Sequence, residues 1–462
     1  MITALMRCLL ALLVAATVLT QVRLIRNLNR DGENSLTEGE TLYALEAVQN
    51  RQPLYHDFSH PPYVLTQYTP LFYFVPGLLT RWLETGTLAT FAIGRSYAYG
   101  CWLGVTALIY LLARQRGCNR GPAVLAALVF LTAPLATGWA NSYRPDSAAL
   151  LFSLAAVLVY DGGKRLPITV LLLAIAFLHK QSAVVALLVI GLEELRSRHW
   201  LRAVAIATGW LAIVATTMVL MQWWSDGAFM MNCFGSLAQM HNWRWPLYLL
   251  GAALLLGAAG FAGGLMTLGV PSASLLKRYF VLSLIFAFLS SAKFGSWTNY
   301  YIEPFAVVCV LTAVGLGQGA QHRLRQFAWL VVALGVTVEV MHSAMRPSDS
   351  ALPRDWKSLG AWGRPLLIED VYVAARLDGE PYMLNPGIFA RLEHSGRFDS
   401  SSLRRAIEQK KFAAIICKRP LDDPDESRPF SSGWRKLMQR YYSLVGQIDT
   451  NMPAETLWVY RP

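Results

Sequence analysis

Three carboxylates with aromatic neighbours follow the first long apolar run of the chain. Glu38 and Glu40 lie in Ser35-Leu-Thr-Glu-Gly-Glu-Thr, and Asp57 lies in Tyr55-His-Asp-Phe-Ser-His. A charged group beside a bilayer is costly, and it is usually retained because it binds or transforms something there. A positioned carboxylate can accept the proton of an attacking hydroxyl group, so these three acids are candidate general bases.

Each of the three acids also has a simpler structural role open to it. Glu38 and Glu40 could cap or solvate the first turn of a helix that we predict from about Thr37 to Gln49. Because they are two residues apart, they point in different directions, and at most one is expected in a shared site. Asp57 could equally be a turn residue. The sequence does not rank the three.

Single basic residues lie at the ends of later apolar runs. They are Arg144 in Ser142-Tyr-Arg-Pro-Asp, Lys180 in His179-Lys-Gln-Ser, and Lys293. One such residue is most often an interfacial anchor whose stem reaches towards the headgroups. The joint occurrence of three, on the side that carries the acidic loop, favours a site for an anionic, lipid-borne group.

The composition places these residues in a polytopic α-helical membrane protein. Of 462 residues, 54% are hydrophobic and 15% are charged, and membrane-length apolar runs recur. We predict about eleven spans, at about 4–24, 91–113, 121–140, 147–160, 166–179, 182–195, 201–224, 246–268, 276–291, 301–319 and 327–344. The fifth and sixth have roughly 14 residues, fewer than a full crossing needs, and indicate a shallow hairpin with Lys180 at its tip.

Positive charge alternates between the loops and predicts the orientation. Arginines and lysines cluster in one set of loops, at Arg114, Arg116, Arg120, Lys164, Arg165, Arg196, Arg198, Arg202, Lys277, Arg278, Arg323 and Arg325. The positive-inside rule makes that set cytoplasmic, so the N-terminus is inside and the acidic loop at 25–90 is outside. The net charge of +12 is spread over short loops and indicates no nucleic-acid partner. The six cysteines show no spacing typical of disulfides or zinc.

The composition changes near residue 346 to that of a soluble domain. We therefore predict a membrane domain at 1–345 and a small extracytoplasmic α/β domain at 346–462. Short buried strands are predicted at 365–370, 381–384, 412–417 and 456–460, with a helix beginning after Asp399.

The order of the motifs resembles the GT-C superfamily of polyprenyl-phosphate-sugar-dependent glycosyltransferases. One span is followed by the acidic outer loop, Arg144-Pro-Asp, a hairpin with Lys180-Gln at its tip, and Lys293-x-Gly-Ser-x-x-Asn-Tyr. The nearest branch is that of bacterial proteins related to protein mannosyltransferases and lipid A aminoarabinose transferases. The resemblance covers most of the membrane domain, and the order of the motifs is more specific than any one of them.

The resemblance implies a site at the outer face of the membrane. Lys180 is expected near the lipid phosphate, and the residues expected around the same cavity are Arg144, Asp146, Lys293, Asn299, Tyr300 and Glu303. Glu38 falls where the family has the second residue of an Asp-Glu pair, but Thr37 replaces the Asp. Since that Asp is the favoured acid in several relatives, the base could be Glu38, Glu40 or Asp57.

The implied activity is transfer of a sugar from a polyprenyl-phosphate donor to a lipid, glycan or protein acceptor. It would take place at the cytoplasmic (inner) membrane of a bacterium, with inversion at the anomeric carbon. No cofactor is implied; carboxylates could hold a divalent cation, although no clustered ligand spacing requires one. The rival hypotheses are a transporter or flippase for lipid-linked sugars, which usually carries charges near the midplane, and a non-catalytic scaffold.

Overall fold

The fold is described from a computed structural model. The structure describes residues 2–35, 37–163, 165–235, 242–265, 273–293, 295–319, 359, 362–377, 380–425, 428–449 and 456–462.

Helices occupy the first ten predicted spans, and the eleventh, at 327–344, lies outside the described residues. The helices are α1 (Ile2–Arg26), α4 (Thr87–Gln115), α5 (Arg120–Thr132), α6 (Pro134–Ala140), α7 (Asp146–Gly163), α8 (Leu166–His179), α9 (Val185–Arg196), α10 (Trp200–Trp224), α12 (Trp245–Leu256), α13 (Ala258–Leu265), α14 (Ser274–Ser290) and α15 (Ile302–Val314). In the described part of the chain, four helices are long and apolar enough to cross a membrane, or six if each bent pair is one span. The number of eleven spans therefore stays a prediction.

One of the two bent pairs has a local cause in the sequence. Helices α5 and α6 meet at 60° where Pro134 forces the preceding residue, Ala133, into an extended conformation (ψ 132°). Helices α8 and α9 have only 14 and 12 residues, and Lys180 follows α8 directly. Lys180 therefore lies between two short helices, as predicted, while the shallow hairpin itself stays a prediction.

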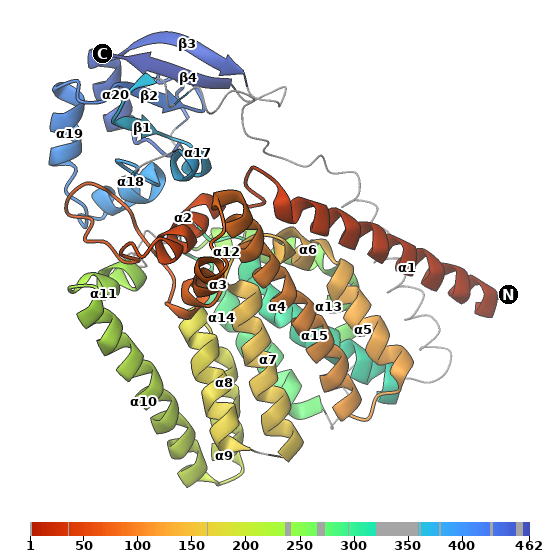
Figure 1. Ribbon diagram of the computed structural model, residues 1–462. Coiled ribbons are helices and arrows are strands. Elements are labelled where there is room, and N and C mark those ends of the chain that lie inside the picture. Colours follow the sequence, from red (N-terminus) through yellow and green to blue (C-terminus); the bar gives the residue numbers. More distant parts are fainter. Residues whose placement is uncertain are drawn as a thin grey trace.

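The membrane helices form one bundle around α15. Figure 1 shows α4, α5, α7, α8 and α15 running side by side, with α10 at the edge. The span that contains α15 is 83% buried, whereas that of α10 is 11% buried. A group on the first turn of α15 therefore lies inside the bundle.

The outer loop between α1 and α4 forms two helices at one end of the bundle. Helix α2 (Glu38–Gln49) was predicted, whereas α3 (Leu71–Trp82) was not. Helix α11 (Ala228–Cys233) lies at the same end.

The C-terminal part is a small α/β unit. Strands β1 (Leu366–Ile368), β2 (Ala414–Cys417), β3 (Ser443–Asp449) and β4 (Thr456–Arg461) form a sheet in the order β1-β2-β4-β3. Strands β1 and β2 are parallel, and the other pairs are antiparallel. The helices of this unit are α17 (Val371–Arg376), α18 (Pro386–His394), α19 (Ser401–Glu408) and α20 (Ser432–Tyr441). The predicted domain boundary at residue 346 lies outside the described residues.

This unit packs on the outer loop of the membrane part, where α17 contacts α2 (Figure 1). The predicted strand at 381–384 does not join the sheet, because this segment pairs with Tyr63 of the outer loop. Tyr63 donates its N–H to the carbonyl of Tyr382 (2.9 Å), and Leu384 donates to the carbonyl of Tyr63 (3.0 Å). Gly39 of α2 lies against α17, where a Cβ would come within 2.8 Å of the Tyr372 backbone. The C-terminal unit and the acidic helix are therefore in direct contact.

Candidate functional site

Glu38 forms a buried ion pair. Its side chain is fully buried, and it faces the equally buried Arg95 of α4. Arg95 donates Nε to Oε1 (3.0 Å) and Nη2 to Oε2 (2.9 Å). The backbone N–H groups of Tyr143 (2.6 Å) and Asn34 (2.7 Å) donate to the same carboxylate. Four donors satisfy a buried carboxylate and fix its position, which suits a structural role.

Asp57 lies in an exposed turn. It accepts hydrogen bonds from the N–H (2.9 Å) and the hydroxyl (2.8 Å) of Ser59. These bonds lower the pKa of the Asp57 carboxyl. This is the geometry of an Asx-turn.

Glu40 points elsewhere than Glu38, as their spacing predicts. Its carboxylate is buried and accepts hydrogen bonds from the amides of Gln67 (3.1 Å) and Asn385. Burial raises the pKa of Glu40, while Asn385 and the nearby arginines oppose the rise. A carboxyl group with a raised pKa is a stronger base at neutral pH.

Three cations lie within electrostatic reach of Glu40, and we call the four groups the interface cluster. They are Glu40, Arg144, Lys293 and Arg391. Arg391 belongs to α18 of the C-terminal unit, and the other three belong to the membrane part and its loops. Arg144 is also held by the hydroxyls of Thr37 (2.9 Å) and Tyr68 (3.3 Å).

A pocket opens beside the interface cluster, with an empty volume of about 480 Å³ including its mouth. Its lining brings together five of the predicted residues, which we call the pocket cluster: Asp146, Lys180, Asn299, Tyr300 and Glu303. They come from the first turns of α7 and α15, the tip between α8 and α9, and the short helix Thr298–Tyr301.

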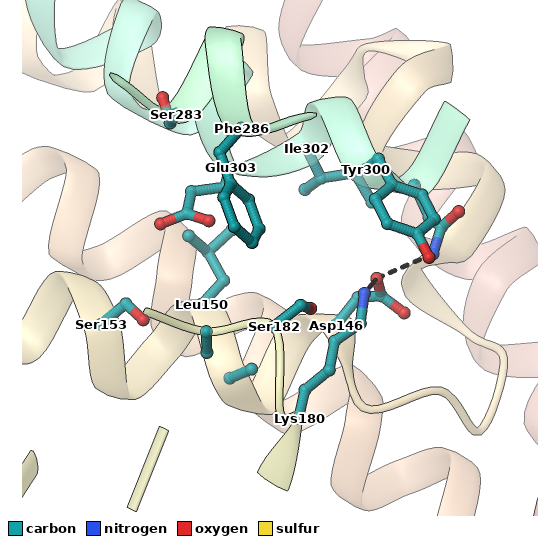
Figure 2. A pocket seen from close by; sticks show the side chains of 13 residues that line it. Asp146, Leu150, Ser153, Lys180, Ser182, Ser283, Phe286, Tyr300, Ile302 and Glu303 are labelled. Carbon is teal, nitrogen blue, oxygen red and sulfur yellow. Dashed lines mark hydrogen bonds and ion pairs between the residues drawn. The ribbon is translucent and has the colours of Figure 1, made fainter. Parts of the chain in front are cut away.

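The polar contacts of the pocket cluster centre on Asp146. Its Oδ1 accepts from Lys180 Nζ (2.6 Å) and from Asn299 Nδ2 (2.8 Å), whereas its buried Oδ2 has no hydrogen-bond partner among the described residues. The ammonium of Lys180 also lies 4.9 Å from the centre of the Tyr300 ring. Figure 2 shows Asp146, Lys180 and Tyr300 at one end of the pocket and Glu303 at the other. Glu303 accepts a hydrogen bond from Tyr279 (2.7 Å).

The two clusters adjoin. The phenol of Tyr68 is hydrogen-bonded to Arg144 and lies in the fields of Asp146, Lys180 and Tyr300. Lys293 likewise lies within reach of Lys180. Together they present cations and carboxylates from separate loops, an arrangement that can hold an anion and accept a proton.

Sequence reasoning missed several residues of this region. Arg391 and Asn385 come from the C-terminal unit, and Gln67 is a neutral partner of Glu40. Arg95 could have been found, because it lies inside a predicted span, where a charge needs a partner. Among the described residues, no group of three or more His, Cys, Asp or Glu side chains could hold a metal ion.

The sequence has no match among protein-family models, nor among curated proteins. Solved structures do match. ArnT from Cupriavidus metallidurans, bound to undecaprenyl phosphate, is 12% identical with a TM-score of 0.65, over 98% of this chain and 97% of that one. The archaeal oligosaccharyltransferase AglB from Archaeoglobus fulgidus, in complex with an inhibitory peptide and a dolichol-phosphate, is 12% identical with a TM-score of 0.56. This match covers 98% of this chain and 74% of that one.

Another match is the arabinofuranosyltransferase AftD from Mycobacteria, 14% identical with a TM-score of 0.55, over 97% of this chain and 39% of that one. At such identities the likeness shows a shared fold. The chain has the fold of the GT-C glycosyltransferases, and the resemblance predicted from the sequence is confirmed at that level.

Proposed function

We propose that this protein is a membrane glycosyltransferase that moves a sugar from a polyprenyl-phosphate donor to an acceptor. The main support is the convergence of Arg144, Lys180 and Lys293, from three separate loops, beside the carboxylates Glu40 and Asp146. The ArnT and AglB structures, which contain undecaprenyl phosphate and a dolichol-phosphate, add support for this class of donor.

The cations would bind the donor phosphate and stabilise its departure. Negative charge develops on the phosphate as its bond to the anomeric carbon breaks, and preorganised cations lower the energy of that state. Although burial opposes it, Asp146 raises the pKa of Lys180 and keeps the ammonium charged. Asp146 and Asn299 thus orient Lys180, and Tyr300 covers it.

Glu40 is our choice of general base. An acceptor hydroxyl of a lipid, glycan or protein would transfer its proton to Glu40 as its oxygen bonds to the anomeric carbon. Attack from the face opposite the phosphate inverts that carbon. Glu38 instead anchors α2 through Arg95, and Asp57 shapes a turn.

We place this reaction at the outer face of the cytoplasmic membrane of a bacterium, with the N-terminus inside and the C-terminal unit outside. The alternation of positive loops supports the orientation. A reporter fused after Met345 should be active outside the cytoplasm, and one fused after Gly163 should be active inside. A cytoplasmic reporter after Met345 would reverse the orientation and the placement of the site.

The direct test incubates the purified full-length protein with a panel of polyprenyl-phosphate sugars and candidate acceptors. We expect release of the free polyprenyl phosphate and a sugar-modified acceptor from at least one donor. Movement of intact donor across the bilayer of a vesicle, with no sugar released from any donor, would instead indicate a flippase.

A further inference from the structure

The interface cluster carries more positive than negative charge. Of its four groups, three are the cations Arg144, Lys293 and Arg391 and one is the carboxylate Glu40, while Arg144 also lies in the field of Asp146 from the pocket cluster. Glu40 directs each of its oxygens to a neutral amide, from Gln67 and Asn385. No hydrogen bond or ion pair joins the ammonium of Lys293 to another described residue.

Two of these cations border one loop. Lys293 and Gly295 lie in the connection between α14 and the short helix Thr298–Tyr301. A Cβ at Gly295 would lie 3.9 Å from Nη2 of Arg391, and a Cβ at Gly387 would lie 3.4 Å from Nη1. The guanidinium is therefore held between the start of α18 and the loop of Lys293.

Two like charges that are half-buried side by side raise the energy of the unliganded site. Burial, together with the charges of Arg391 and Lys180, lowers the pKa of Lys293 to about 8. A bound anion would offset both the repulsion and the lost hydration. An ammonium next to a guanidinium fork suits phosphate oxygens especially well.

We propose that Arg391 and Lys293 together bind an anionic group, a phosphate, of a substrate. The C-terminal unit would then contribute a substrate-binding residue, Arg391, to a site otherwise built by the membrane part. This inference rests on the proposed transferase function and extends it. The phosphate could be that of the lipid donor or one carried by the acceptor.

The first measurement compares the binding of undecaprenyl phosphate and undecaprenol to the purified full-length protein in detergent. The ratio of the two affinities isolates the contribution of the phosphate. If the donor is the source, Arg391→Ala and Lys293→Ala should each lower the ratio about tenfold or more. The fold-loss of the double variant should be smaller than the product of the two single fold-losses, because both cations hold one anion.

The controls separate binding from folding. Arg440→Ala removes an exposed arginine of the same unit, on α20, and should leave the ratio unchanged. Arg391→Lys keeps the positive charge but loses the two parallel N–H donors of the guanidinium. Its affinity ratio should therefore lie between those of Arg391→Ala and the wild type. All variants should elute like the wild type in size-exclusion chromatography before their affinities are compared.

The second measurement uses inorganic phosphate as the probe for an acceptor phosphate. An amine-reactive reagent at pH 8 labels Lys293, and mass spectrometry measures the extent with undecaprenyl phosphate already bound. If the acceptor is the source, phosphate should protect Lys293 in the wild type and in Arg440→Ala, less in Arg391→Lys, and not in Arg391→Ala.

The outcomes distinguish this inference from the proposed function. A wild type with equal affinity for undecaprenyl phosphate and undecaprenol would contradict the donor class, while phosphate protection that depends on Arg391 would still support the cation pair. If Arg391→Ala matches the wild type in both measurements, the inference is wrong, whatever the enzyme transfers.

Discussion

The pocket cluster and the interface cluster adjoin, yet they balance their charges in different ways. In the pocket, Lys180 is paired with Asp146 at 2.6 Å, and Asn299 donates to the same carboxylate oxygen. In the interface cluster, Arg144, Lys293 and Arg391 lie within electrostatic reach of Glu40. One cluster is built around a close ion pair, whereas in the other no hydrogen bond or ion pair joins the ammonium of Lys293 to another described residue.

Glu38 provides the reference for a carboxylate whose charge is fully matched. Glu38 is two residues before Glu40, on the same helical turn. Four donors bind its carboxylate, and its side chain is fully buried. The contrast with Glu40 shows that two acids on the same turn of a helix meet different surroundings, because they point in different directions. Each prediction below separates a matched charge from an unmatched one.

The largest effect is expected from Glu40→Gln. The amide keeps the shape of the side chain but cannot take a proton, so the turnover rate should fall about 10²- to 10⁴-fold. Donor affinity should change much less. Single-turnover sugar transfer and donor titration measure the two quantities separately.

Amide variants at the other acids serve as controls. Asp57→Asn should keep full activity, and Glu38→Gln should lower stability, because Arg95 would lose its counterion. Full activity in Glu40→Gln, with a loss of turnover but not of donor binding in Asp146→Asn, would move the role of base to Asp146.

The second prediction concerns the matched pair of the pocket. Lys180 and Asp146 have side chains that are only 13% and 8% exposed. Lys180→Ala would leave a buried carboxylate uncompensated, which typically costs about 3–5 kcal/mol. The double variant Lys180→Met with Asp146→Asn should recover much of that stability without restoring donor binding. A denaturation midpoint of Lys180→Ala equal to that of the wild type would show that the pair does not matter for folding.

The membrane helices could be predicted because apolar runs of sufficient length report them directly. The breaks were harder: the bend before Pro134 depends on one residue, and α3 lies in a loop whose apolar residues do not reach span length. Strand β3 was missed because it is a half-exposed segment, with Gly446 in its middle. The segment at 381–384 has strand composition, but it pairs with Tyr63, more than 300 residues away in the sequence.

The same distinction holds for the site. Motif order grouped Asp146, Lys180 and Asn299, and the structure does bring them together. Arg391 carries no local signal, since its role depends on how the C-terminal unit packs against the membrane part. The ion pair between Glu38 and Arg95 carries no local signal either, because it joins two segments that only the tertiary fold brings together.

Gly39→Ala is expected to disturb one cluster and spare the other. Its Cβ would come within 2.8 Å of backbone atoms of α17, which cannot move as a side chain can. Overpacking of this kind costs about 1–3 kcal/mol and should loosen the contact of the C-terminal unit with α2. The preference for undecaprenyl phosphate over undecaprenol should fall, as it does in Arg391→Ala. Lys180→Ala should still lower stability when it is made in the Gly39→Ala background.

Gly100→Ala is the matched control, because Gly100 is also helical and nothing lies within 4 Å of its Cβ position. Hydrogen exchange of 39–49 and 371–376 measures the loosening. Unchanged exchange in Gly39→Ala would mean that the contact between the two units tolerates the methyl group.

The smallest effect is a pH dependence of phosphate binding, which should come from the unmatched cation. Since the pKa of Lys293 is lowered to about 8, the unliganded ammonium loses its proton as the pH rises through 8. The charged fraction falls up to about tenfold between pH 7 and 9, and the preference for undecaprenyl phosphate over undecaprenol should weaken in that direction. A phosphate loses its second proton near pH 6, below this window. Lys293→Arg keeps its charge throughout and should abolish the decline, whereas Lys180, matched by Asp146, should contribute none. A decline that persists in Lys293→Arg would assign the titration to another group.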